Sequence, residues 1–85
     1  MTIKEVTEKL ENNNVYPDQV CLKNGVFTVK WGYYYHNGRT PDKYCAQIIR
    51  VFPLVTIVES GDHFGSFKGG KSVSANSHFF VKFKP

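Results

Sequence analysis

The chain has 85 residues, enough for one small hydrophobic core but too few for the sheet-and-helix scaffold of most nucleotide-hydrolysing enzymes. Its composition, 41% hydrophobic and 15% aromatic, excludes intrinsic disorder, because disordered chains lack the residues that offset ordering entropy. The formal net charge of +4 favours encounters with phosphates or acidic protein surfaces. We therefore expect a single domain over residues 1–85.

A surface helix is predicted at the start of the chain. Thr2 and Glu5 form a T-x-x-E capping box, in which each side chain accepts a hydrogen bond from the backbone N–H of the other residue. The helix begins near Ile3 and ends at residues 12–14, a run of three asparagines. One apolar stripe recurs at helical spacing: Ile3, Val6 and Leu10.

A β-hairpin is predicted next. Two strand-like segments, residues 20–23 and 26–31, flank Asn24-Gly25, the dipeptide that best tolerates the positive φ angles of a type I′ turn. The second strand is expected to continue to Tyr35. Its alternation assigns one set of side chains to the core: Phe27, Val29, Trp31, Tyr33 and Tyr35. The opposite face receives Thr28, Lys30, Gly32, Tyr34 and His36.

A second helix and two further strands complete the predicted elements. Thr40 is a helix cap, Pro41 suits the first helical position, and Pro53 lies where the helix must stop. The expected buried stripe is Tyr44, Cys45, Ile48, Ile49 and Phe52. A strand over residues 54–59, a glycine-rich loop over 60–77 and a last strand over 78–84 follow.

The order α-β-β-α-β-β predicts an α+β two-layer sandwich, with two helices on one face of an antiparallel four-stranded sheet. The strand order within the sheet stays open. Because the second sheet face has no cover, basic and aromatic side chains share it: Lys30, Tyr34, His36, His78, Phe80, Lys82 and Lys84.

This mixture of side chains is typical of surfaces that bind single-stranded nucleic acid. Aromatic rings such as Tyr34 and Phe80 stack on bases, and lysines neutralise the phosphates. The alternative is that the two rings pair across strands or meet a partner chain.

Residues 65–72 match the phosphate-binding pattern G-x-x-x-x-G-K-S. A nucleotide-hydrolysing P-loop needs a buried parallel strand before it and a helix after it, whereas only 13 residues follow Ser72 and most of them resemble a strand. A chance match is therefore favoured. If the sheet face binds nucleic acid, Lys68 and Lys71 are the expected phosphate contacts in this loop.

The sequence gives less support to a metal site or a catalytic site. His36, His63 and His78 with the two cysteines lack the close pairs of a zinc site, so no metal or cofactor is predicted. A small ribonuclease using His78 or His36 with Lys82 and an acidic neighbour, Asp62 or Glu59, remains an alternative.

Cys21 and Cys45 are the only cysteines, and Met1 leads directly into the helical pattern without a secretory segment. A reduced, cytoplasmic protein follows, with one disulfide as the alternative. No apolar run has the length of a membrane span, so no membrane association is predicted.

The chain resembles a group of small bacteriophage proteins over residues 26–84. The resemblance lies in residues 33–35, Gly38, the glycine-rich loop and residues 77–83. It implies an accessory protein that acts inside a bacterial host by binding a host protein or nucleic acid, and it assigns no active-site residue. The positive charge argues against an acidic mimic of DNA.

We therefore predict a small basic binding module without enzymatic activity, which contacts nucleic acid through the open sheet face and the glycine-rich loop. The alternative is a protein-interaction module, either a modulator of a host protein with an acidic surface or a homodimer joined through the same face. Both a monomer and a homodimer are compatible with the sequence.

Overall fold

The computed structural model describes residues 1–32, 41–63 and 78–85. The elements follow the predicted order and are α1 (Ile3–Asn12), β1 (Gln19–Lys23), β2 (Val26–Gly32), α2 (Pro41–Val51), β3 (Thr56–His63) and β4 (His78–Lys84).

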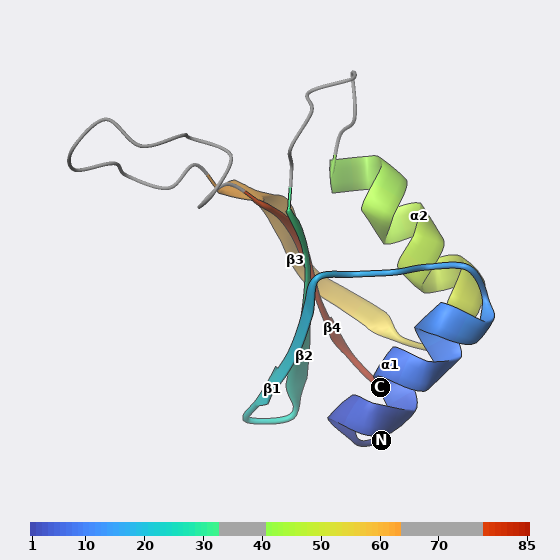
Figure 1. The fold of residues 1–85 in the computed structure, drawn as a ribbon. Helices are drawn as coiled ribbons and strands as arrows, with labels where there is room; N and C mark the ends of the chain where they lie inside the picture. The colour runs from blue at the N-terminus through green and yellow to red at the C-terminus, as the bar shows by residue number, and fades with distance from the viewer. Residues whose placement is uncertain (33–40, 64–77) are drawn as a thin grey trace, which may run out of the picture.

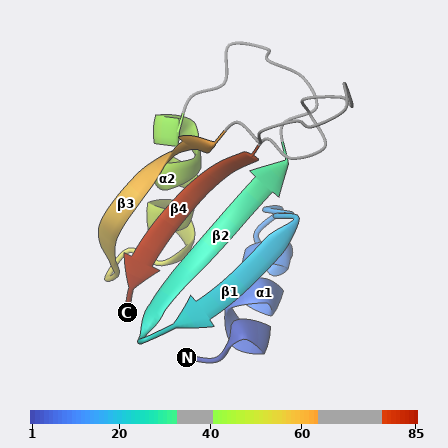
Figure 2. The same cartoon turned by 90° about the vertical axis from the view of Figure 1, so that its left-hand side faces the viewer.

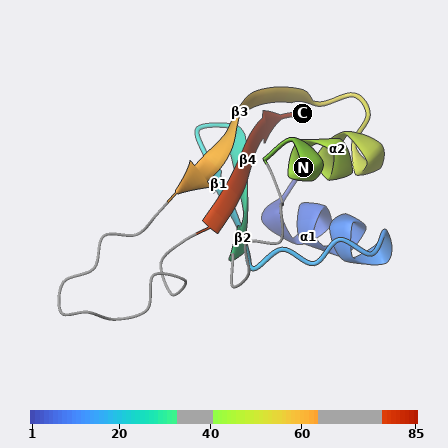
Figure 3. The same cartoon turned by 90° about the horizontal axis from the view of Figure 1, so that it is seen from above.

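Four antiparallel strands form one sheet in the order β1-β2-β4-β3. Both helices lie against the same face of this sheet, as Figure 1 shows from the side and Figure 3 from above. The predicted α+β fold is confirmed, and the strand order left open by the sequence is now defined. Figure 2 is turned so that the uncovered sheet face points toward the viewer.

The pairing of β2 with β4 decides which side chains are buried. Three cross-strand pairs, Phe27 with Phe83, Val29 with Val81 and Trp31 with Phe79, consist entirely of buried residues. The pairs between them, Thr28 with Lys82 and Lys30 with Phe80, are half-buried and point to the opposite face. The predicted alternation is confirmed over the described part of both strands.

The helices close the core through aromatic contacts. The Tyr44 ring of α2 lies 4.5 Å from Trp31 and 5.1 Å from Phe79, measured between ring centroids. Beyond the end of α2, Phe52 stacks on Phe83 at 5.6 Å. Such pairs contribute about 0.5–1.5 kcal/mol beyond the area they bury, so they fix how the helix layer sits on the sheet.

Two predicted local motifs are present. Thr2 N donates to Glu5 Oε1 at 2.9 Å and Glu5 N donates to Thr2 Oγ1 at 3.1 Å, which completes the capping box. Hydrogen bonds from Thr2, the backbone one first, lower the pKa of Glu5. In the hairpin, Asn24 and Gly25 have φ angles of 52° and 77°, as a type I′ turn requires.

The third strand is longer than predicted. Residues 60–63 were expected in the loop, yet they belong to β3, because each of them pairs with a residue of β4. The strand also begins at Thr56 rather than at residue 54. Tertiary pairing therefore overrides the local turn signal of Ser60-Gly61-Asp62.

The helix stripes also need correction. Ile3 and Ile49 are exposed, Cys45 is half-buried, and Val51 is buried although it was not predicted. The predicted continuation of β2 to Tyr35 lies outside the described residues.

Replacing Gly25 with Ala should destabilise the protein by about 1 kcal/mol, because a Cβ atom disfavours the positive φ of 77°. Asn24→Gly keeps the turn accessible and should change the free energy of unfolding by less. Urea denaturation of both variants measures the difference, and equal losses would contradict the assigned turn.

Candidate functional site

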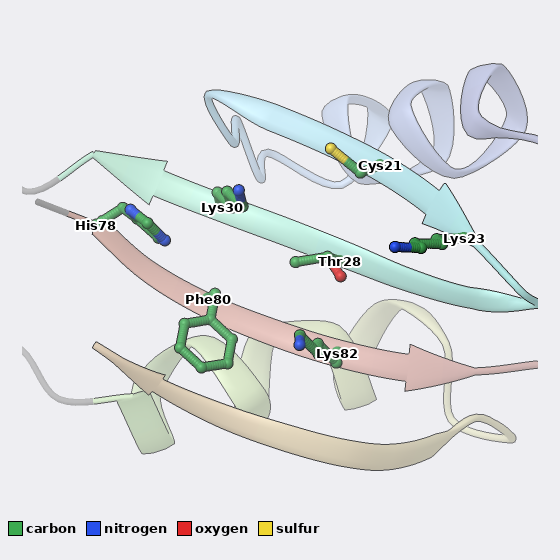
Figure 4. Close-up of a pocket in the computed structure, with 7 residues that line it drawn as sticks. All are labelled: Cys21, Lys23, Thr28, Lys30, His78, Phe80 and Lys82. Carbon is green, nitrogen blue, oxygen red and sulfur yellow. The ribbon is translucent and has the colours of Figure 1, made fainter. Parts of the chain in front are cut away.

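The open sheet face carries a shallow hollow of about 440 Å³. Its lining comes from β1, β2 and β4, and Figure 4 shows these side chains standing on the face opposite the helices. The lining residues are Cys21, Lys23, Thr28, Lys30, His78, Phe80 and Lys82.

A second hollow of about 310 Å³ adjoins the first at the end of the sheet near the hairpin. The two share Lys23, Thr28 and Lys82, so they form one continuous surface, which we call the basic track. The second hollow adds Asn24, Val26, Val58 and Glu59. The basic track thus crosses all four strands.

Positive charge dominates this surface. Lys23, Lys30 and Lys82 line the basic track, and Lys84 follows on the same side of β4 by strand alternation. Within the described residues, Glu59 is the one carboxylate that lines either hollow. The track is therefore suited to a negatively charged ligand.

Glu59 reaches the open face through a β-bulge. The register between β3 and β4 shifts between Ile57 and Glu59, and Val58 is the extra residue. Glu59 is consequently the partner of Lys82, and Lys82 Nζ lies 3.5 Å from Glu59 Oε1. Because the two side chains are 39% and 56% exposed, this ion pair contributes at most about 1 kcal/mol to stability.

Phe80 lies near the centre of the track, and its ring leans toward β3 (Figure 4). Its cross-strand partner is Gly61, where an added Cβ atom would lie 3.2 Å from Phe80 Cζ and 3.3 Å from Cε1. The ring thus covers the space above the glycine. Lys82 Nζ lies 5.7 Å from the centre of the same ring, and the His78 ring lies 6.2 Å away.

The structure brings together four of the predicted site residues, Lys30, His78, Phe80 and Lys82. Lys84 is exposed at the end of β4. The other predicted site residues, Tyr34, His36, Lys68 and Lys71, lie outside the described residues, as does the P-loop match at 65–72.

Three residues line the site although they were not among the predicted site residues: Cys21, Lys23 and Thr28. The two-residue turn contained the necessary signal, because it pairs residue 23 with 26 and residue 21 with 28. This register places all three side chains on the same face as Lys30.

The elements flanking the P-loop match do not have P-loop topology. β3 precedes it as an edge strand paired antiparallel with β4, and β4 itself follows it. A P-loop needs a parallel strand and a following helix. The described elements therefore favour a chance match.

Among the described residues of the proposed ribonuclease site, His78 does not form an acid and base pair with Glu59 or Asp62, and His36 lies outside the described residues. Glu59 pairs with Lys82 and His63 with His78, so Glu59 and His78 lie four positions apart along the ladder, about 13 Å. Asp62 pairs with Phe79, which points to the helix side. Among the described residues, no group of three His, Cys, Asp or Glu side chains could hold a metal ion.

The two cysteines are free thiols. Cys21 lines the open face, whereas Cys45 of α2 packs against the core on the other side of the sheet. The alternative of a disulfide between them is therefore wrong.

A separate apolar hollow lies on the helix side, where the two ends of the chain meet. It has a volume of about 330 Å³ and its lining includes Met1, Phe52, Leu54 and Pro85. Leu54, which borders this hollow, is 93% exposed.

Comparisons with protein-family models, curated proteins and solved structures find no significant match. In the described part of the chain, neither helix has the length and apolar character needed to span a membrane.

The contact between Phe80 and Gly61 should appear as an energetic coupling. Gly61→Ala should be neutral or destabilising in the wild-type background, because the ring must move by a few tenths of an ångström. In a Phe80→Ala background the same change should stabilise the strand by about 0.5–1 kcal/mol, since alanine orders a strand better than glycine does.

Urea unfolding of the four proteins of this double-mutant cycle measures the coupling. An effect of Gly61→Ala that is identical in both backgrounds would show that the ring does not rest on the glycine.

Proposed function

We propose that the protein is a non-enzymatic binding module for single-stranded nucleic acid, which contacts its ligand through the basic track. The observation that carries the proposal is the juxtaposition of Lys30, Lys82 and the Phe80 ring on the sheet face opposite the helices. A cytoplasmic location agrees with this function and is part of the proposal.

The charge of the track supports a phosphate-bearing ligand. Lysines from β1, β2 and β4 converge on one surface, while the carboxylate that lines it in the described part of the chain, Glu59, is at its end near the hairpin. Lysine ammonium groups neutralise backbone phosphates and release counterions, which supplies most of the affinity of sequence-independent binding.

The Phe80 ring favours a single-stranded nucleic acid over a duplex as the ligand. Bases of a single strand expose their π faces and can stack on an aromatic ring, whereas bases in a duplex are already stacked on each other. The ring is half-buried and is held between Gly61 and Lys82, so little side-chain entropy is lost when a base stacks on it. A pre-positioned ring of this kind resembles the stacking platforms of sheet-based RNA-binding modules.

Fluorescence anisotropy with labelled single-stranded and duplex oligonucleotides tests the proposal. Binding should be tighter to the single strand, and the logarithm of the binding constant should fall with the logarithm of the salt concentration with a slope of roughly −2 to −3, since each neutralised phosphate contributes about −0.7. The absence of salt-sensitive binding to any single strand would overturn the proposal.

Side-chain replacements separate the two contributions. Lys82→Gln should weaken binding about three- to tenfold at low salt and flatten the salt slope. Phe80→Leu should weaken binding about five- to hundredfold while leaving the slope unchanged, because it removes only stacking.

Lys4→Gln is the matched control for these variants. Lys4 forms an ion pair with Glu8 on α1, at 3.9 Å, so its replacement removes the same charge from the helix layer. It should change binding much less than Lys82→Gln. Equal effects of the two replacements would indicate that net charge alone governs binding.

A protein-interaction module is the second candidate, and the exposure of Leu54 beside the apolar hollow favours it. A partner protein would remain bound in nuclease-treated bacterial lysate, and Leu54→Asp would release it whereas Lys82→Gln would not. The resemblance to bacteriophage accessory proteins is compatible with either candidate.

A further inference from the structure

We propose that Glu59 is a built-in competitor for the phosphate position at Lys82, so that it limits the affinity of the basic track for every polyanion. The inference deepens the proposed function and rests on it for the identity of the natural ligand. It concerns a positioning residue, because Glu59 acts through the Lys82 ammonium group.

The Lys82 ammonium group can pair either with the Glu59 carboxylate or with a phosphate of the ligand. Its Nζ lies 3.5 Å from the Glu59 carboxylate and 5.7 Å from the centre of the Phe80 ring. A phosphate that reaches Lys82 from solvent must therefore displace or approach the carboxylate. Because both side chains are partly exposed, the ion pair is weak enough to be broken by a ligand.

The β-bulge in β3 brings the Glu59 carboxylate to Lys82 at the end of the track near the hairpin. With a regular register in place of the bulge, strand alternation from Ile57 would place Val58 opposite Lys82 and turn Glu59 toward the helix side. The bulge instead aims the carboxylate at the ammonium group. Lys30 lies opposite Phe80, farther from the hairpin, where no described lining residue is acidic.

Two consequences distinguish competition from a general effect of charge. Removing the carboxylate should leave Lys82 free to contact phosphate more fully than in the wild type, which makes the salt slope steeper by up to about 0.7 for a single strand. The gain should also require Lys82, since Glu59 exerts its effect through that side chain.

The experiment compares Glu59→Gln with Glu8→Gln, which removes the same charge from the matched ion pair between Lys4 and Glu8 on α1. Anisotropy with a labelled single-stranded oligonucleotide and direct calorimetric titration with inorganic polyphosphate provide two independent probes. Glu59→Gln should strengthen binding of both about three- to tenfold at low salt, and Glu8→Gln less than twofold.

The double variant Glu59→Gln/Lys82→Gln completes the cycle and should bind no more than about twofold tighter than Lys82→Gln alone. Thermal unfolding of each variant provides the control for folding, and an exposed pair predicts little change. A full gain in the Lys82→Gln background, equal gains from Glu59→Gln and Glu8→Gln, or an unchanged salt slope would each overturn the inference.

The two probes separate this inference from the proposed function. If wild type binds the oligonucleotide and Glu59→Gln brings no gain, the inference fails and the proposed function stands. If no variant binds the oligonucleotide, the proposed function fails, and polyphosphate binding still decides whether Glu59 competes for Lys82. Absence of binding to both probes overturns both proposals.

Discussion

The antiparallel register between β2 and β4 is the constraint on which the other features depend. Phe27, Val29 and Trp31 meet Phe83, Val81 and Phe79 under the helices, and this alone turns the intervening residues outward. A slip by one residue would bury lysines in place of aromatic rings, which no helix packing could offset. The core and the basic track are therefore two results of the same pairing.

The asymmetry of the two layers explains why so small a chain has a surface available for binding. Both helices lie on one sheet face, so neither of them covers the second face (Figure 2). Phe80 illustrates the compromise, because its ring shields Gly61 of the edge strand while remaining half-exposed itself. The same ring thus supports the strand and presents an aromatic surface.

Much of the fold was predictable because several of its signals are local. Asn24-Gly25 specifies the turn, Thr2 and Glu5 specify the start of α1, and alternation assigns Trp31 and Phe83 to the core. The extension of β3 was not predictable in this way. Ser60-Gly61-Asp62 has the composition of a turn, and only its pairing with β4 keeps it extended.

The candidate site was partly predictable for the same reason. Lys30, Phe80 and Lys82 follow from alternation within single strands, whereas Lys23 requires the hairpin register and Glu59 requires a bulge that no residue pattern indicates. The strand register decides which charged side chains pair across neighbouring strands, because a one-residue shift exchanges the partner of every residue.

The meeting of the two chain ends has a practical consequence. Met1 and Pro85 line the same hollow on the helix side, and Figure 1 shows both ends there. A fusion partner, fluorophore or surface attachment joined to either end would therefore project away from the lysine-bearing side of the sheet. Joining the two ends with a short peptide would likewise leave that side unobstructed.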